Sequence, residues 1–424
     1  MEGFYQLGNK LENEWRAADY DEEVFPALAA DGLRAACLHE KYTPWQVLEW
    51  TLDQVELPRQ RDIPGRFGEP PITVFSGPRF HVDVYFWFHG TTSTHQHSFC
   101  GAFQVMHGSS IHSWYEFDLK DTVSSFCEIG EMRLKTCELL NEGDVQPILA
   151  GRQYIHGLFH LDQPSVSIVV RTDKSPLFLP QFDYRKPGLA IDPFYEHDAT
   201  TKKLQVVGAL LHAKQPDADK LITKLLDTAD FHTAYLILAN VYNRLAGNSV
   251  EQMFGGSESR RRFEALLSFA ESRHSERGDI LRRVFEHHER VEDLVRRRSF
   301  VQNPEHRFFF ALLLNADGRE RILSLIRDRF KDADPVEKIL DWTYELSQIR
   351  LAGIDNQNAL GIAGFDDFDL TLVEYLLRGR SDIQMAEIVR EIYAPEKAEA
   401  LLPNLSDRTS LIKNSIVFAP LLND

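Results

Sequence analysis

Residues 90–108 read GTTSTHQHSFCGAFQVMHG and contain two histidines, His95 and His97, separated by one residue. Because the side chains of a β-strand alternate between its two faces, this spacing on a strand places both imidazoles on one face. Two ligands from one strand and a third from a neighbouring strand would form a facial set around an octahedral metal ion. The stretch therefore predicts a metal site on a β-sheet.

A second stretch, residues 143–160 (GDVQPILAGRQYIHGLFH), can supply the third ligand through His156, which follows a turn and a glycine-containing bend. A histidine taken alone is more often a hydrogen-bonded structural residue than a ligand. Here half of the chain's 16 histidines lie between positions 81 and 160, namely His81, His89, His95, His97, His107, His112, His156 and His160. This clustering favours metal binding over a structural role.

The surrounding sequence has the period of two that is typical of β-strands. Aromatic or β-branched runs occupy residues 72–75, 80–89, 111–119, 129–140 and 165–171. Turn residues separate the runs, which predicts a β-sandwich or barrel. In the run from Arg79 to His89 one face is apolar and the other carries His81, Tyr85 and Trp87, which would line either the barrel cavity or the solvent.

Helical periodicity is found on both sides of this β segment. Residues 6–57 show it before a Pro- and Gly-rich loop, with Thr43 as the expected N-cap of a helix that begins at Pro44. After residue 185 the expected helices are 203–226, 233–245, 260–298, 306–314, 319–330, 335–349 and 370–377. We therefore predict an α+β multidomain chain: an N-terminal helical segment (1–71) packed on the outside of an antiparallel β-barrel (72–185), and a C-terminal all-α domain (186–424).

The composition excludes several classes of protein. A net charge of −17 argues against a nucleic-acid surface, which needs clustered Lys and Arg. No apolar run is long enough to span a bilayer, and the N-terminus lacks the pattern of a signal peptide. The four cysteines do not form a disulfide framework or a CxxC pair. A cytoplasmic protein that binds neither membrane nor nucleic acid is expected.

The two histidine-containing stretches resemble the two sequence motifs of the cupin superfamily, whose fold is a double-stranded β-helix. His95, His97 and Gly108 are in register with the first motif, where Gly90 lies one residue too close. Gly143 and Gly151 match the second motif, and His156 matches it after a slip of two residues near Tyr154. The resemblance is limited to the central β segment and implies the jelly-roll barrel and the ligands His95, His97 and His156.

The sequence departs from the usual cupin pattern at Gly101, which stands where most members carry a glutamate ligand. The resemblance then implies a three-histidine site like that of the cysteine dioxygenase-like cupins. In those enzymes Ser, His and Tyr on the strand after the last ligand point toward the metal. Ser167 matches this set, but Val169 and Arg171 replace the His and Tyr, so a thiol substrate is not implied.

Several further residues are candidates for the site. His160 and Tyr154 could transfer protons. Arg171 could bind a substrate carboxylate in bidentate fashion, unless it is an exposed strand-end arginine. Tyr85, Trp87 and His81 would contact substrate if their face of the strand lines the cavity.

Three functions are compatible with these features. The first is a non-haem Fe(II) dioxygenase that acts on a small anionic substrate and O2. The second is a non-redox isomerase, decarboxylase or hydrolase that uses Zn, Mn or Ni, because imidazole suits all of these ions. The third is a metal- or ligand-sensing cupin whose helical domain binds a protein partner or a second copy of the chain.

Overall fold

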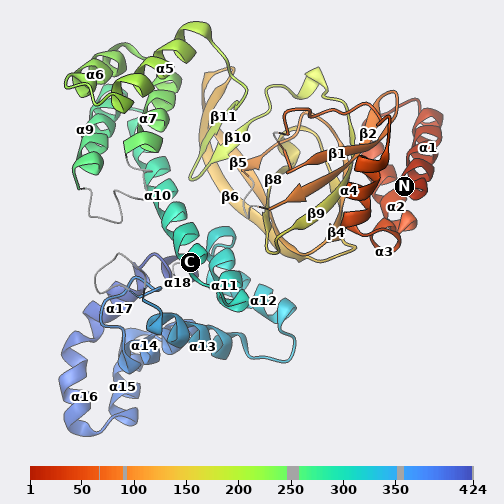
Figure 1. The fold of residues 1–424 in the computed structure, drawn as a ribbon. Coiled ribbons are helices and arrows are strands. Elements are labelled where there is room, and N and C mark those ends of the chain that lie inside the picture. The colour runs from red at the N-terminus through yellow and green to blue at the C-terminus, as the bar shows by residue number, and fades with distance from the viewer. Residues whose placement is uncertain (66, 89–92, 246–256, 351–357, 423–424) are drawn as a thin grey trace. The chain divides into compact units, whose positions relative to one another are not determined.

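The computed structural model describes residues 1–65, 67–88, 93–245, 257–350 and 358–422. The chain divides into two compact units, which are described separately (Figure 1). The first contains Met1–Lys120, Gly130–Arg185 and Ala190–Phe194, and the second contains Asp121–Ile129, Lys186–Leu189 and Tyr195–Asp424. The predicted mixed fold, with a closed β-barrel and helices toward both ends of the chain, is confirmed.

The strands form an open five-stranded sheet, in the order β1-β2-β9-β4-β7, and a closed six-stranded barrel, in the order β10-β11-β6-β5-β8-β3. The sheet consists of β1 (Pro71–Ser76), β2 (Phe80–Trp87), β4 (Gly101–His107), β7 (Val145–Ile148) and β9 (Ser165–Thr172). The barrel consists of β3 (Thr94–His95), β5 (Ser110–Ser124), β6 (Cys127–Leu140), β8 (Ile155–His160), β10 (Asp183–Arg185) and β11 (Leu189–Ile191).

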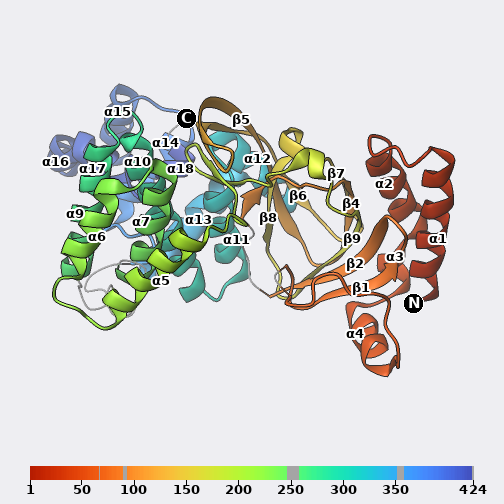
Figure 2. The ribbon, with the colours of Figure 1, turned by 90° about the horizontal axis from the view of Figure 1, so that it is seen from above.

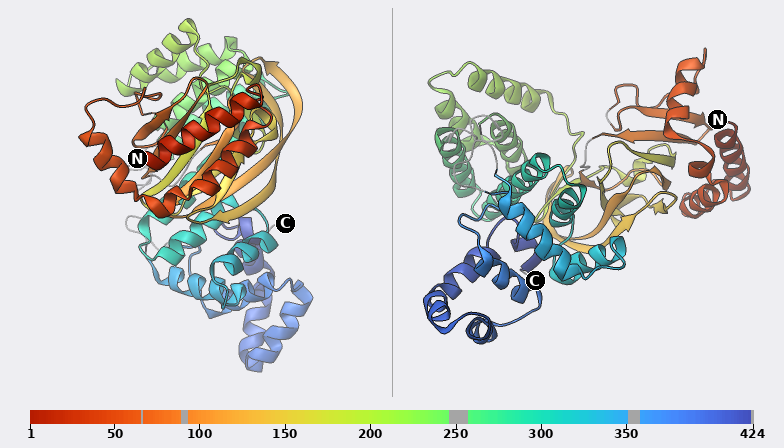
Figure 3. Two further views of the ribbon diagram at one scale, coloured as in Figure 1. Left: turned by 90° about the vertical axis from the view of Figure 1, so that its right-hand side faces the viewer. Right: turned by 60° about the horizontal axis from the view of Figure 1, so that its bottom comes forward.

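The N-terminal helices pack on one face of the five-stranded sheet, as expected from the sequence. They are α1 (Glu2–Ala17), α2 (Phe25–Ala36), α3 (Leu38–Lys41) and α4 (Pro44–Asp53). Figure 2 and the left view of Figure 3 show α1 and α2 beside this sheet. Phe80, Val82, Val84 and Phe86 of β2 share a buried apolar core with Trp15 and other residues of these helices. Because β2 alternates, His81, Asp83, Tyr85 and Trp87 point to the opposite side of the sheet.

Helix α4 begins as predicted. Thr43 is its N-cap and forms a capping box with Gln46, in which the Gln46 amide donates to Thr43 Oγ1 at 3.3 Å and the Thr43 amide donates to Gln46 Oε1 at 2.8 Å. These two bonds satisfy backbone donors that have no partner within the first turn of the helix.

The second unit is helical. Its helices are α5 (Asp198–His212), α6 (Ala218–Thr228), α7 (Phe231–Leu245), α9 (Ser257–Arg273), α10 (Gly278–Phe300), α11 (Pro304–Asn315), α12 (Arg319–Arg329), α13 (Pro335–Gln348), α14 (Asp367–Leu377), α15 (Asp382–Ile392), α16 (Pro395–Leu401), α17 (Leu405–Lys413) and α18 (Ala419–Leu422). The right view of Figure 3 shows the later helices with the C-terminus. Within the described residues, none of these helices is both long and apolar enough to cross a membrane.

Two of the long helices predicted from periodicity are wrong, because each is two helices. The predicted helix 203–226 breaks after His212, where Lys214 takes a left-handed conformation with φ of 50° and Pro216 lacks the N–H that a helix interior requires. The predicted helix 260–298 breaks before Gly278. A Cβ at Gly278 would lie 2.2 Å from the carbonyl oxygen of Glu271, so the chain can turn this tightly only at a glycine.

Candidate metal centre

The strand expected to carry both His95 and His97 is split between the two sheets. β3 ends at His95, and β4 begins only at Gly101, so the intervening residues pass from the barrel to the five-stranded sheet. His97 lies in this connection, where its backbone forms a bridge to Ala150. β3 pairs with β8 so that His95 is directly opposite His156. Strand pairing, rather than alternation along one strand, therefore brings the three histidines together.

The three imidazoles form a compact group. One ring nitrogen from each of His95, His97 and His156 lies within 4.8 Å of the other two, and this is the only such group of potential metal ligands in the described part of the chain. His97 and His156 are buried, and His95 is partly exposed. Burial lowers the pKa of all three below the ordinary histidine value, and in His97 and His156 the neighbouring imidazoles lower it further. All three are therefore neutral near pH 7, the state in which imidazole binds metal ions.

The ring orientations fit a shared metal ion. His95 Nδ1 lies 2.7 Å from the Ser93 carbonyl oxygen, so Nδ1 is the donor and Nε2 keeps its lone pair. His97 Nε2 and His156 Nε2 are 2.8 Å apart. Two nitrogens bound at right angles, each about 2.1 Å from one ion, would be about 3 Å apart. The buried His97 Nδ1 has no hydrogen-bond partner among the described residues. The polar contact of this ring is therefore made by Nε2, with His156.

The histidines lie at the wall of a cavity of about 330 Å³ in the first unit. Most of its other lining residues are aromatic or aliphatic: Phe67, Tyr85, Trp87, Phe99, Phe103, Ile148, Leu158 and Val169. The polar lining residues are Ser93, His160, Ser167, Arg171, Lys174 and Gln181. The cavity can therefore enclose a small molecule in largely apolar surroundings beside the histidine group, an arrangement common in ligand sites.

One polar group at the wall is an arginine paired with a buried carboxylate. Arg171 Nε donates to His81 Nε2 at 3.0 Å and lies 3.5 Å from Asp83 Oδ2. Asp83 also accepts from the hydroxyls of Thr73 at 2.7 Å and Tyr85 at 2.9 Å. Burial alone would raise the pKa of Asp83, but contact with His81, whose Nε2 lies 3.2 Å from Asp83 Oδ2, and the charge of Arg171 outweigh it and lower this pKa. Asp83 is therefore ionised and balances the charge of Arg171.

His160 also lines the cavity. Its ring stacks on Trp87 with the centroids 4.8 Å apart, and Nδ1 lies 3.0 Å from Ser110 Oγ. Its Nε2 is buried and has no partner among the described residues. Burial lowers the pKa of His160 to about 3, so the imidazole is neutral near pH 7. Trp87 Nε1 donates to Ser167 Oγ at 3.3 Å, which fixes the indole against this ring.

The cavity brings together His160, Arg171, Tyr85 and Trp87 from the predicted set, but not Tyr154 and His81. Tyr154 does not line it, and its hydroxyl lies 3.3 Å from His112 Nε2, behind the metal group. Burial raises the pKa of Tyr154, so the phenol keeps its proton at neutral pH. His81 contacts Arg171 instead of the cavity.

Gly101 lies where two strands approach closely. A Cβ there would lie 1.9 Å from the carbonyl oxygen of Val170, so the glycine permits close approach of β4 and β9. Gly90 and His89 lie outside the described residues.

Sequence reasoning missed two residues behind the metal group. His112 of β5 contacts both His156 and Tyr154, and its other nitrogen contacts Glu138 of β6. In the sequence, His112 was only one of the eight histidines between positions 81 and 160 and belonged to no recognised motif. Glu138 carried no signal at all, because its contact with His112 depends on the register between β5 and β6.

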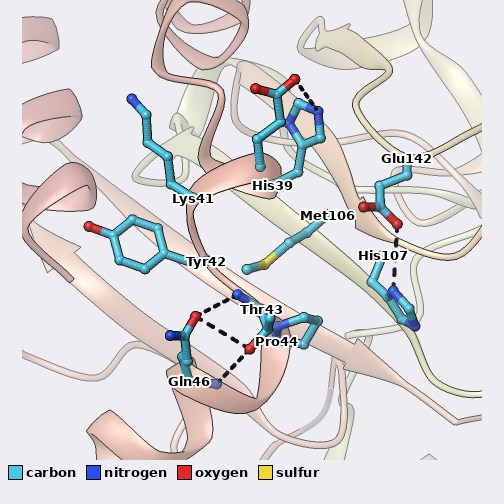
Figure 4. A pocket seen from close by; sticks show the side chains of 10 residues that line it. His39, Lys41, Tyr42, Thr43, Pro44, Gln46, Met106, His107 and Glu142 are labelled. Atoms are coloured by element: carbon cyan, nitrogen blue, oxygen red, sulfur yellow. Dashed lines mark hydrogen bonds and ion pairs between the residues drawn. The ribbon is translucent and has the colours of Figure 1, made fainter.

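A second hollow lies between the N-terminal helices and β4 (Figure 4). It has a volume of about 160 Å³. His39 lies 3.9 Å from Glu40, and His107 lies 3.6 Å from Glu142. In the part of the chain that the structure describes, its side chains form no three-ligand group, so it does not compete with the His95/His97/His156 site.

Comparison with known proteins adds no family assignment. No model of a protein family matches the chain, and no curated protein matches it. The closed barrel and the histidine group are compatible with a metal-binding cupin-like fold.

Proposed function

We propose that this protein is a metal-dependent enzyme of the cupin type, and specifically a non-haem Fe(II) dioxygenase with a small anionic substrate. The observation that carries the proposal is the convergence of neutral His95, His97 and His156 on the wall of a mostly apolar cavity. Three neutral ligands leave the charge of a divalent ion uncompensated, which favours an anionic substrate beside it.

His95, His97 and His156 would hold the iron through one ring nitrogen each. Iron bound there would supply the one-electron chemistry that O2 activation requires, in a site with positions left open for substrate and O2. Because imidazole also suits Zn and Ni, the choice of iron is part of the proposal and must be measured.

The other cavity residues have distinct roles in the proposal. The hydrogen bond from Arg171 to His81 uses Nε, so the terminal guanidinium nitrogens of Arg171 can bind the anionic group of the substrate. Tyr85, Trp87 and Phe103 surround its apolar part and exclude water. His160 lies in the cavity wall as a neutral imidazole and is the candidate for holding a proton near the substrate.

The test is to purify the full chain without chelator, measure its metal content, and follow O2 uptake with a panel of small carboxylates, amino acids and thiols. Stoichiometric iron with substrate-dependent uptake supports the proposal. Bound zinc, manganese or nickel without uptake would replace it with a non-redox metal enzyme. A chain with no tightly bound metal would favour a sensor whose helical region contacts a partner.

Variants identify the ligands in the same assay. His95→Ala and His156→Ala should each abolish metal binding, because two imidazoles cannot hold the ion tightly. His107→Ala is the matched control, since His107 is an exposed histidine at the end of β4, outside the site. Equal metal content in all three variants would exclude the proposed ligand set.

A further inference from the structure

Behind His156 a line of polar side chains leads away from the cavity. His112 of β5 is 1% exposed, and its Nε2 lies 3.2 Å from His156 Nδ1. On the other side of the ring, His112 Nδ1 lies 3.0 Å from Glu138 Oε1. Glu138 belongs to β6 and its side chain is 45% exposed. The line therefore joins a buried imidazole of the metal group to a carboxylate at the surface of the barrel.

The order of donors and acceptors along this line follows from the carboxylate. An ionised carboxylate can only accept hydrogen bonds, so Glu138 takes the Nδ1–H of His112. A neutral imidazole has one donor and one acceptor nitrogen, so His112 Nε2 is then the acceptor and takes the Nδ1–H of His156. His156 must consequently carry its lone pair on Nε2, the nitrogen that lies 2.8 Å from His97 Nε2.

Two neighbouring contacts agree with this order. The protonated phenol of Tyr154 also reaches His112 Nε2, at 3.3 Å, which suits an acceptor at that nitrogen. Gln146 of β7 donates its Nε2–H to Glu138 Oε1 at 3.0 Å. This bond fixes the carboxylate, although the Glu138 side chain is 45% exposed. Gln146 of the five-stranded sheet thus holds the Glu138 carboxylate, and Glu138 holds His112 of the barrel.

We propose that His112 and Glu138 are positioning residues that hold His156 in its Nδ1–H tautomer and aim its Nε2 lone pair at the metal. The inference rests on the proposed metal site. It assigns a role to two residues that touch neither metal nor substrate. Groups that orient a ligating histidine in this way typically change metal affinity by about 10- to 100-fold when removed.

The first test reads the tautomer directly in the metal-free chain. Full-length protein labelled with ¹⁵N-histidine is freed of metal, and long-range ¹H–¹⁵N correlation spectra assign the protonated nitrogen of each ring. The His156 signals are identified by their loss in His156→Gln. We expect His156 to be protonated at Nδ1 in the wild type and to lose this single tautomer in His112→Phe. A wild-type His156 protonated at Nε2 would overturn the inference.

The second test measures the affinity for Co²⁺ by competition with a chelator. His112→Phe should raise the Kd by about 10- to 100-fold, and Glu138→Leu should raise it in the same direction. His112→Gln should restore most of the affinity, because its side-chain carbonyl can accept from His156 while its amide donates to Glu138. Glu131→Leu, at an exposed position on the same strand, is the matched control and should not change the Kd.

The two tests separate the inference from the proposed function. If the wild type binds no Co²⁺, the proposed metal site is excluded. The tautomer of His156 in the metal-free chain still tests whether His112 positions it. If the wild type binds Co²⁺ and the affinities of His112→Phe and Glu138→Leu are unchanged, the positioning role is wrong and the metal site stands. Because Glu138 is half-exposed, Glu138→Leu keeps the test valid should His112→Phe fail to fold.

Discussion

Replacing Asp83 with asparagine should destabilise the barrel unit because it leaves Arg171 without its buried counter-charge. The side chains of Asp83 and Arg171 are 3% and 18% exposed, and Arg171 Nε lies 3.5 Å from Asp83 Oδ2. Removing one partner of a buried ion pair costs about 3–5 kcal/mol, because the remaining charge stays desolvated. Since Arg171 keeps some contact with water, we expect the lower end of this range, about 3 kcal/mol.

The assay is urea unfolding at pH 7, followed by tryptophan fluorescence. Five of the six tryptophans lie within the first 114 residues, and only Trp342 is in the helical unit, so the signal reports mainly on the barrel unit. Asp118→Asn is the control: Asp118 is paired with Lys120 at an exposed position, where loss of the pair should cost less than about 1 kcal/mol.

A double-mutant cycle isolates the ion pair from other effects of the substitution. Arg171→Met removes the cationic guanidinium from Asp83, which keeps its contacts with His81, Thr73 and Tyr85, and should also destabilise the unit. The double variant Asp83→Asn/Arg171→Met has no unpaired charge, so it should be more stable than the sum of the single effects predicts, by about 2 kcal/mol or more. Additive effects, or a loss no greater than that of Asp118→Asn, would refute the charge-pairing argument.

The pH dependence gives an independent check with a defined sign. The folded-state pKa of Asp83 is lower than its ordinary value, so its ionisation stabilises the fold fully above about pH 4. This contribution is lost as the pH falls through the folded-state pKa. The stability difference between wild type and Asp83→Asn should therefore be constant from pH 7 to pH 5 and should shrink at lower pH.

Two further predictions concern the same unit. Gly101→Ala should lower stability by about 1–3 kcal/mol, because its Cβ would meet the Val170 carbonyl oxygen. Gly157→Ala is the control in the same unit, because its Cβ would come no closer than 3.4 Å to its neighbours and should meet no such clash. Thermal unfolding compares the two variants, and equal losses would contradict the close-approach explanation. His160 has a folded-state pKa of about 3, below its ordinary value, so its neutral form stabilises the fold fully above about pH 6.5. As the pH drops from there toward 3, the contribution of His160 to the free energy of unfolding falls by up to about 1.4 kcal/mol per pH unit. His160→Gln should therefore show a shallower loss of stability between pH 6.5 and pH 4 in urea titrations, and an unchanged slope would argue against a buried neutral imidazole.

Local sequence patterns determined much of the architecture. Alternation in β2 separated an apolar face from a face with Tyr85 and Trp87, because the two sides of a strand meet different surroundings. The Thr43–Pro44 pair marked the start of α4, since an N-cap and a first-turn proline act within one turn of helix. The spacing of His95, His97 and His156 identified the group that the structure brings together.

Features that depend on contacts between distant segments could not be predicted from the sequence. The face of β2 with Tyr85 and Trp87 could have lined solvent or cavity, and only the packing of the five-stranded sheet against barrel strands such as β8 decided for the cavity. Helical period continued through residues 213–217 and 274–277, where turns break the chain, because periodicity is insensitive to a short interruption.

The site shows the same division between local and tertiary information. The sequence by itself indicated which histidines could bind a metal, because His95 and His97 are two positions apart and His156 lies in a second histidine-containing stretch. Only the tertiary structure decided that His95 meets His156 across a strand pair, and that His112 and Glu138 stand behind them. The physical reason is that strand register is set by the packing of the whole barrel, which places side chains 20 to 60 positions apart within hydrogen-bonding distance.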